Sequence, residues 1–156
     1  MAMDRQMGQI EADSRTRQYF EGVGFEIGDM KNQPEYILQC QIAEFLRRQY
    51  PRVRFLSDVR AALKLTIPQQ VRAKKIQADD FACPDMMIFQ PSGDWHGMFL
   101  ELKAESPYRR DGRLKTDDHL ERQHKSITIL ADLGYHADFY WTFEQAEKAI
   151  REYLNA

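Results

Sequence analysis

Cysteine is scarce in this sequence: Cys40 and Cys83 are the only two among 156 residues. Two thiols are too few for a disulfide framework or a cysteine-rich zinc site, and they favour a reducing compartment. Long apolar runs are also missing, since none approaches the roughly 20 residues that a membrane-spanning helix needs. The first eleven residues hold no apolar stretch of the kind found in a secretory signal. These absences predict a cytoplasmic protein.

Net charge is low as well, at −2. This argues against a protein that coats nucleic acid through bulk charge, but local basic groups remain compatible with a nucleic-acid partner. Positions 60–75 hold five basic residues and no acidic one, and a second basic group covers positions 103–115. Such runs are usually solvated faces, so their meaning depends on what lies beside them.

Hydrophobic periodicity separates a polar arm, residues 1–31, from a domain of residues 32–156. The arm is rich in Gln, Glu, Asp and Gly, and it is expected to be poorly ordered alone or packed on a partner. The domain begins with a helix from Pro34 to about Gln49, for which Asn32 is the expected cap and Glu35 the capping-box residue. Its predicted apolar stripe consists of Leu38, Ile42, Phe45 and Leu46.

The remaining elements follow from alternation, turn residues and caps. We expect strands at 53–56, 86–89, 97–103 and 136–141, with a turn at 91–94. Helices are expected from Pro68 to Lys75, from a cap at Thr116 to Leu133, and after the capping box at Thr142. This order predicts an α/β sandwich with a mixed central sheet flanked by helices.

The pair of strands around the turn carries the most informative residues. Glu101 and Lys103 are two apart, so they project from the same face of a strand, opposite Leu102. If the hairpin turns about Gly93, Asp85 lies across from Glu101, whereas a shift of one residue would separate them. In the predicted register, two carboxylates meet with an amine beside them.

Oxygen ligands on neighbouring strands suit Mg²⁺ or Mn²⁺. With such an ion bound, a water molecule becomes a better nucleophile toward a phosphodiester, and Lys103 is placed to orient or deprotonate that water or to neutralise transition-state charge. A Glu-x-Lys sequence alone is more often a surface ion pair. The preceding Pro84–Asp85 makes the functional interpretation stronger.

These residues resemble the VRR-NUC (virus-type replication-repair nuclease) branch of the PD-(D/E)XK superfamily. That family has a Pro-Asp strand, a Glu-[Val/Leu]-Lys strand, a glutamine on the next helix, and Leu-x-x-x-Gly before a strand and a final helix. The resemblance covers about residues 34–154. One departure is Ala82, where the family usually has glycine. The matching residues here are Ala82–Ile88, Phe99–Lys103, Gln123, Leu130 and Gly134–Tyr135, with Pro34–Gln39 as the first helix.

The resemblance implies a PD-(D/E)XK fold and assigns roles to individual residues. Asp85 and Glu101 would bind metal, and Leu102 would add its backbone carbonyl. Lys103 would be the catalytic lysine. The candidate catalytic residues are then Glu35, Asp85, Glu101, Lys103 and Gln123, with Glu35 reaching the metal directly or through water.

Several of these residues have an alternative reading. Glu35 is equally well explained as a helix-capping residue, and Glu44 is a rival carboxylate on nearly the opposite face of the same helix. Gln123 lies on an apolar stripe, where a hydrogen-bonded core amide is the alternative to a site residue. Gln39 lies one turn after Glu35, where it is placed to support that residue, although a surface glutamine is its default reading.

Stand-alone members of the family are small homodimers that act on branched DNA such as Holliday junctions, so the resemblance implies a homodimeric, structure-selective DNA endonuclease. The rivals are a nuclease of the same fold that cuts unbranched DNA or RNA, and a non-catalytic DNA-binding module. In each case the basic groups would contact phosphates. The predicted DNA-binding residues are Arg60, Lys64, Arg72, Lys74, Lys75, Arg109, Arg110, Arg113 and Lys115.

Overall fold

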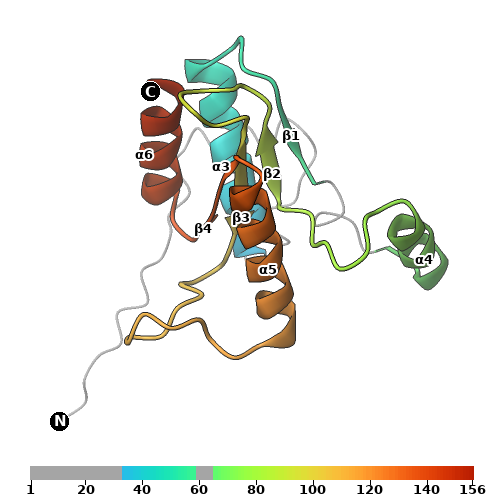
Figure 1. Ribbon diagram of the computed structural model, residues 1–156. Coiled ribbons are helices and arrows are strands. Elements are labelled where there is room, and N and C mark those ends of the chain that lie inside the picture. The colour runs from blue at the N-terminus through green and yellow to red at the C-terminus, as the bar shows by residue number, and fades with distance from the viewer. Residues whose placement is uncertain (1–32, 59–64) are drawn as a thin grey trace. The chain divides into compact units, whose positions relative to one another are not determined.

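A computed structural model of the chain describes residues 33–58 and 65–156, and the statements below refer to these ranges. The predicted arm of residues 1–31 lies outside them, as do Arg60 and Lys64 of the first basic group. Figure 1 shows the order of the described elements. They are α3 (Pro34–Gln49), β1 (Phe55–Ser57), α4 (Ile67–Lys75), β2 (Met86–Ile88), β3 (Met98–Leu102), α5 (Asp118–Asp132), β4 (His136–Tyr140) and α6 (Phe143–Leu154).

The four strands form one sheet in the order β1-β2-β3-β4. β2 pairs antiparallel with both β1 and β3, and β3 pairs parallel with β4. A parallel pair needs a crossover connection, and α5 supplies it between β3 and β4. The predicted mixed sheet is therefore confirmed, although β1 is shorter and lies further along the chain than the strand expected at 53–56.

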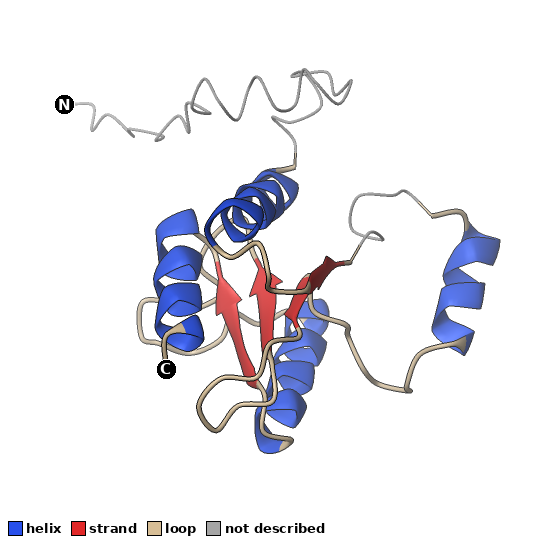
Figure 2. Cartoon of the chain, turned by 90° about the horizontal axis from the view of Figure 1, so that it is seen from above, coloured by secondary structure: helices blue, strands red, loops and turns tan. Residues whose placement is uncertain are grey.

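Helices cover both faces of this sheet. Figure 2 shows α3 and α6 on one side of the strands and α5 on the other. The larger core joins the predicted α3 stripe to the inward side chains of β2 and β3, such as Met86 and Leu100, and to Ile150 of α6. A smaller cluster joins Leu120 and Ile127 of α5 to Phe139 of β4. Within the described ranges, each helix is too short or too polar to cross a lipid bilayer.

Two predicted helix caps are wrong by one residue. The cap of α3 is Gln33 rather than Asn32, and its side chain forms no capping hydrogen bond. The cap of α5 is Asp117 rather than Thr116, because the Asp117 carboxylate accepts from the backbone N–H of Leu120 at 2.8 Å. The cap at Thr142 is confirmed, with its hydroxyl accepting from the N–H of Gln145.

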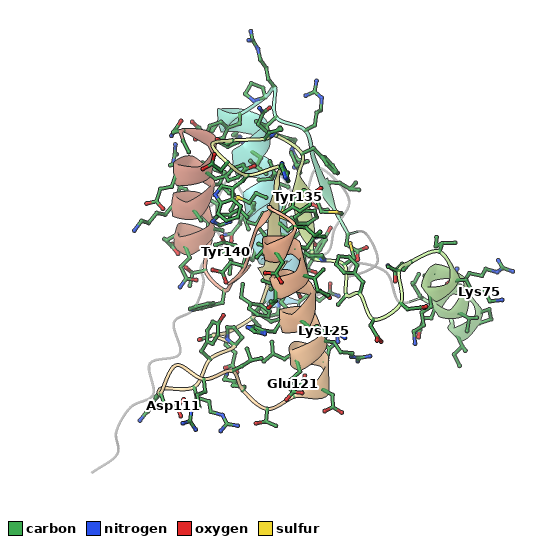
Figure 3. All side chains as sticks on the ribbon, in the orientation of Figure 1. Lys75, Asp111, Glu121, Lys125, Tyr135 and Tyr140 are labelled. Atoms are coloured by element: carbon green, nitrogen blue, oxygen red, sulfur yellow. The ribbon has the colours of Figure 1, made fainter. Side chains whose placement is uncertain are left out.

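The helix α4 buries none of its side chains. It begins at Ile67, next to the predicted start at Pro68, and the Gln69 side chain accepts from the backbone N–H of Thr66 at 2.8 Å. Both apolar Ile67 and the basic residues of this helix are exposed. Figure 3 labels one of those basic residues, Lys75. Local capping and helix propensity, rather than core packing, hold α4 together.

Candidate active site

The pairing of β2 with β3 determines which side chains meet. Met86 lies opposite Leu100, and the same register sets Asp85 opposite Glu101. This is the register expected from a turn about Gly93, whose positive φ of 55° suits glycine. Leu100 and Met86 enter the core on the α3 side of the sheet. Alternation therefore directs Asp85 and Glu101 to the opposite face, where α5 lies.

Three hydrogen bonds fix Asp85 at the start of β2. Its carboxylate Oδ2 accepts from the backbone N–H of Leu102 at 2.7 Å. Its own carbonyl accepts from the N–H of Asp58 at 2.7 Å and from Nε2 of Gln39 at 3.0 Å. Both the backbone and the carboxylate of Asp85 are thereby held against neighbouring elements.

The proline of the Pro-Asp pair, Pro84, changes the hydrogen bonding at the end of β3. Extended by one more residue, the β2–β3 register sets Pro84 opposite Leu102. A residue there would ordinarily donate its N–H to the Leu102 carbonyl, but proline has no N–H. The Leu102 carbonyl consequently lacks that donor, which is compatible with the metal-ligand role that the family resemblance implies for it.

Glu101 lies at the centre of a polar cluster. Its side chain is only 3% exposed. Its Oε1 accepts from Nζ of Lys103 at 3.0 Å and from Nε2 of Gln123, which reaches it from α5. The other amide atom of Gln123, Oε1, is buried without a partner among the described residues. Gln123 is thus a buried amide that also binds the Glu101 carboxylate.

The pairing of half-buried Asp85 with buried Glu101 is electrostatically unfavourable when both carboxylates are ionised. Burial raises the pKa of Asp85 to about 6, although the Leu102 hydrogen bond opposes the change. Burial and the nearby Asp85 charge raise the pKa of Glu101 to about 8, with Lys103 acting in the other direction. A cation beside both groups would favour their charged forms, and such perturbed pairs are typical of functional sites.

The donor set fits a hard divalent cation. Two carboxylates, one backbone carbonyl and one unpartnered amide oxygen all present oxygen atoms, which Mg²⁺ and Mn²⁺ prefer. Across the described ranges, no three His, Cys, Asp or Glu side chains form a ready-made metal cluster. This composition suits an ion that keeps several waters and takes further oxygens from a substrate.

Glu35 is exposed at the first turn of α3. Its Oε1 accepts from the backbone N–H of Ala104 at 3.3 Å, so its side chain extends to the chain that leaves β3 rather than capping its own helix. Its charge also raises the pKa of both Asp85 and Glu101. The rival carboxylate Glu44 instead forms an ion pair with Arg48.

Sequence reasoning missed two supporting residues, Ser126 and Asp58, and treated Gln39 as a surface residue by default. Gln39 is 6% exposed, so its reading as a surface residue is wrong. Ser126 is fully buried on α5, where its hydroxyl accepts from the N–H of Ala82 at 2.8 Å and donates to the carbonyl of Arg122. Asp58 contributes its N–H to Asp85. Helical spacing gave the only signal: Gln39 is four residues after Glu35, and Ser126 is three after Gln123.

The predicted DNA-binding residues do not lie on β2 and β3, the strands that carry the two carboxylates. The second group occupies the loop between β3 and α5, whose outer bend carries Asp111 in Figure 3. Lys115 pairs with Glu105 at 2.6 Å, and the guanidinium of Arg109 donates to the hydroxyl of Thr116. Acidic neighbours therefore offset part of the charge of this loop. The described members of the first group, Arg72, Lys74 and Lys75, lie on α4.

Comparisons with known proteins add information on the fold. No family model matches the chain, and no curated protein matches it. A solved structure described as a VRR_NUC domain protein is similar, with a TM-score of 0.53 and 19% sequence identity. The similarity covers 78% of this chain and 88% of that one. At this level of identity the comparison concerns the fold: the chain has the fold of a VRR_NUC domain protein.

Proposed function

We propose that the chain is a Mg²⁺- or Mn²⁺-dependent endonuclease of the PD-(D/E)XK type that hydrolyses phosphodiester bonds in DNA. The observation that carries the proposal is the pairing of half-buried Asp85 with buried Glu101, with Lys103 bound to Glu101 at 3.0 Å. A buried carboxylate, a half-buried carboxylate and a half-buried lysine have no evident structural use at the edge of a core. They suit a cation, a water nucleophile and a phosphate.

In this proposal Asp85, Glu101 and the Leu102 carbonyl hold the cation, and Glu35 contributes from α3. When bound, the cation polarises the scissile phosphate and lowers the pKa of a water that serves as nucleophile. Gln123 and Lys103 hold Glu101 in one orientation through their hydrogen bonds. The remaining N–H groups of the Lys103 ammonium are available to a phosphate oxygen.

The reaction itself is a hydrolysis. The water oxygen forms a bond to phosphorus and gives up one proton, the bond from phosphorus to the leaving sugar oxygen breaks, and that oxygen takes up one proton. Negative charge grows on the phosphate oxygens in the transition state, and Lys103 stabilises it electrostatically. Because Lys103 is anchored to Glu101 before substrate arrives, little reorganisation is needed at the moment of reaction.

Structured or branched DNA, such as a Holliday junction, is the proposed substrate, with a homodimer as the active form. Support comes from the family resemblance and from basic residues on α4 and on the loop of residues 103–117, which suit phosphates rather than base edges. We place the dimer contacts in the polar arm or in α3. A nuclease acting on unbranched DNA or RNA, and a non-catalytic binding module, are the competing outcomes.

A substrate panel separates these outcomes. Junction, flap, duplex and single-stranded DNA, together with matched RNA, would be incubated with the chain and Mg²⁺ or Mn²⁺, with EDTA as the control. We expect metal-dependent cutting that is fastest on the branched substrates. If plain duplex is cut as fast as branched DNA, the chain is a general nuclease without selectivity for branches. If the chain binds DNA without metal and cuts none of the substrates, it is a binding module and not an enzyme.

A further inference from the structure

The face of β1 and β2 that carries Asp85 continues away from the candidate active site as an open surface. Leu56 pairs with Met87, and the register extends in both directions, as the bonds from Phe89 N–H to Arg54 O and from Asp58 N–H to Asp85 O confirm. Cross-strand partners project from the same face of a sheet. The three successive pairs on this face are Asp58–Asp85, Leu56–Met87 and Arg54–Phe89.

Within residues 33–58 and 65–156, no element covers this face away from the carboxylates. The helix on this side, α5, packs against β4 at the other edge of the sheet. Leu56 is 52% exposed and Phe89 is 55% exposed, in contrast to Ile88 beside it, which lies on the opposite face and is 1% exposed. An aromatic ring half open to solvent on the same strand face as a candidate catalytic carboxylate is a place where a substrate can bind.

We propose that Phe89 and Arg54 form a nucleotide-binding surface for an unpaired stretch of the DNA strand that is being cut. The proposal rests on the function proposed above and specifies its substrate further. Aromatic rings stack on the faces of nucleobases with little regard to sequence. Within a duplex those faces are already stacked, so only an unpaired, unstacked base can offer one to Phe89.

The spacing fits a continuous strand of substrate. Asp85 and Phe89 are four residues apart on one strand, which corresponds to about 13 Å at about 3.3 Å per residue. A stacked nucleic-acid strand advances about 3.4 Å per nucleotide, so the stacked base lies within about four nucleotides of the scissile phosphate. The surface is therefore continuous with the site of cutting.

Charge along the face supports the same occupant. The carboxylates Asp58 and Asp85 lie at the end where the cation is proposed, whereas Arg54 lies at the Phe89 end. Two backbone carbonyls, those of Pro51 and Arg52, orient the Arg54 guanidinium by accepting from its Nη1 at 3.3 and 3.2 Å. A guanidinium has five N–H donors, so others are available to a phosphate.

The test compares intact and abasic substrates. After the cut is mapped on a branched DNA with an unpaired arm, an abasic residue replaces each of the four nucleotides on either side of it in turn. We expect one abasic position to lower kcat/KM of the wild type by at least about fivefold, the effect of losing one base–aromatic stack. Phe89→Ala should cut the intact DNA slower by a similar factor and should be insensitive to that abasic position.

Matched variants separate stacking from folding. Phe89→Trp should preserve the discrimination, and Phe89→Leu should lose it although it keeps an apolar side chain. Leu133→Ala alters an exposed leucine at the end of α5 and should match the wild type. Arg54→Gln should weaken binding of labelled arm DNA and reduce the slope of log affinity against log salt by about one.

Two results would overturn the proposal. In the first, Phe89→Ala cuts as fast as the wild type and shows the same abasic profile; the nuclease assignment survives but this surface does not bind bases. In the second, Phe89→Ala changes the mass in light scattering from dimer to monomer and leaves DNA binding unchanged; the face is then a contact between two copies. If the wild type cuts nothing, the fluorescence anisotropy of the labelled arm DNA in EDTA still compares DNA binding by the wild type with DNA binding by Phe89→Ala.

Discussion

The side-chain amide of Gln39 donates to the backbone carbonyl of Asp85 over 3.0 Å, across 46 residues of sequence. One turn earlier on the same helix, Glu35 accepts from the N–H of Ala104. The helix α3 therefore contacts the chain at the start of β2 and at the end of β3, the two places that carry the candidate catalytic residues. This contact explains why a polar side chain is buried on the apolar stripe of α3.

Gln39→Leu removes the amide donor and puts an apolar side chain of similar size in its place. We expect kcat to fall about tenfold or more, because small displacements of catalytic groups are costly, with KM for DNA little changed. Gln49→Leu, the same replacement at the exposed end of α3, is the control. Equal kcat for the two variants would show that the Gln39 contact does not position Asp85.

Cation binding should release a proton near neutral pH. At pH 7, a pKa of about 6 leaves Asp85 mostly ionised, whereas a pKa of about 8 leaves Glu101 mostly protonated. Because carboxylates bind metal in their charged form, we expect about one proton released per ion bound at pH 7 and almost none at pH 9. Calorimetry of Mn²⁺ binding in buffers of different ionisation enthalpy measures this number, and its absence at pH 7 would contradict the assignment of Glu101.

Asp85→Asn should stabilise the metal-free protein, and only at higher pH. Burial raises the pKa of Asp85 above its ordinary value, so the folded state favours the protonated carboxyl. The wild type accordingly loses stability as pH rises from 3.8, the ordinary pKa of an aspartate, through about 6, the pKa of Asp85 in the folded state. Asparagine can still accept from the Leu102 N–H but carries no charge.

The measurement is thermal unfolding in EDTA at pH 5 and at pH 8. We expect Asp85→Asn to raise Tm at pH 8 by more than about 3 °C, the shift that about 1 kcal/mol produces in a domain of this size. The gain should shrink at pH 5. A variant less stable than the wild type at both values would mean that the carboxylate charge is not a source of strain in the folded state.

Ser126 should matter for stability because it joins α5 to the loop before β2. Ser126→Ala leaves the half-buried Ala82 N–H without its acceptor. A fully buried unsatisfied donor costs about 1–3 kcal/mol, so we expect a loss near the lower end of that range. Thr128→Ala is the control, since Thr128 makes the same type of bond to a carbonyl four residues earlier but on the exposed face. Urea unfolding of the two variants tests this, and similar midpoints would count against a tie between α5 and the loop.

The fold could be predicted from the sequence largely because its local signals agree. Alternation around Glu101 and a turn at Gly93 determined the register, and the stripe beginning at Leu38 determined the buried face of α3. The caps at Asn32 and Thr116 were predicted one residue too early. At α5 the adjacent Asp117 can accept the same hydrogen bond as Thr116, and the three-dimensional path of the chain selects Asp117. The cap of α3 forms no side-chain hydrogen bond, so its start follows from the backbone path alone.

The supporting contacts of the candidate site could not be predicted in the same way. Gln39 and Ser126 form hydrogen bonds to partners more than forty residues away in the sequence. Helical spacing places both on inward faces, but it does not identify those partners. The exposure of Phe89 is also a tertiary property, since it depends on α5 covering β4 rather than β2. The hydrophobic periodicity of a sequence predicts on which face of a helix or strand a residue lies. Whether the residue is buried depends on what packs against that face.

The measurement that most directly tests the account is the metal-dependent nicking rate of the wild type and of Lys103→Ala on branched DNA. Lys148→Ala, which removes an exposed lysine of α6, is the matched control. We predict that the wild type and Lys148→Ala cut equally with Mn²⁺, and that Lys103→Ala loses at least about a hundredfold in rate, as expected when a group that stabilises transition-state charge is removed. A Lys103→Ala variant that cuts as fast as the wild type would contradict the assignment of Asp85, Glu101 and Lys103 as an active site.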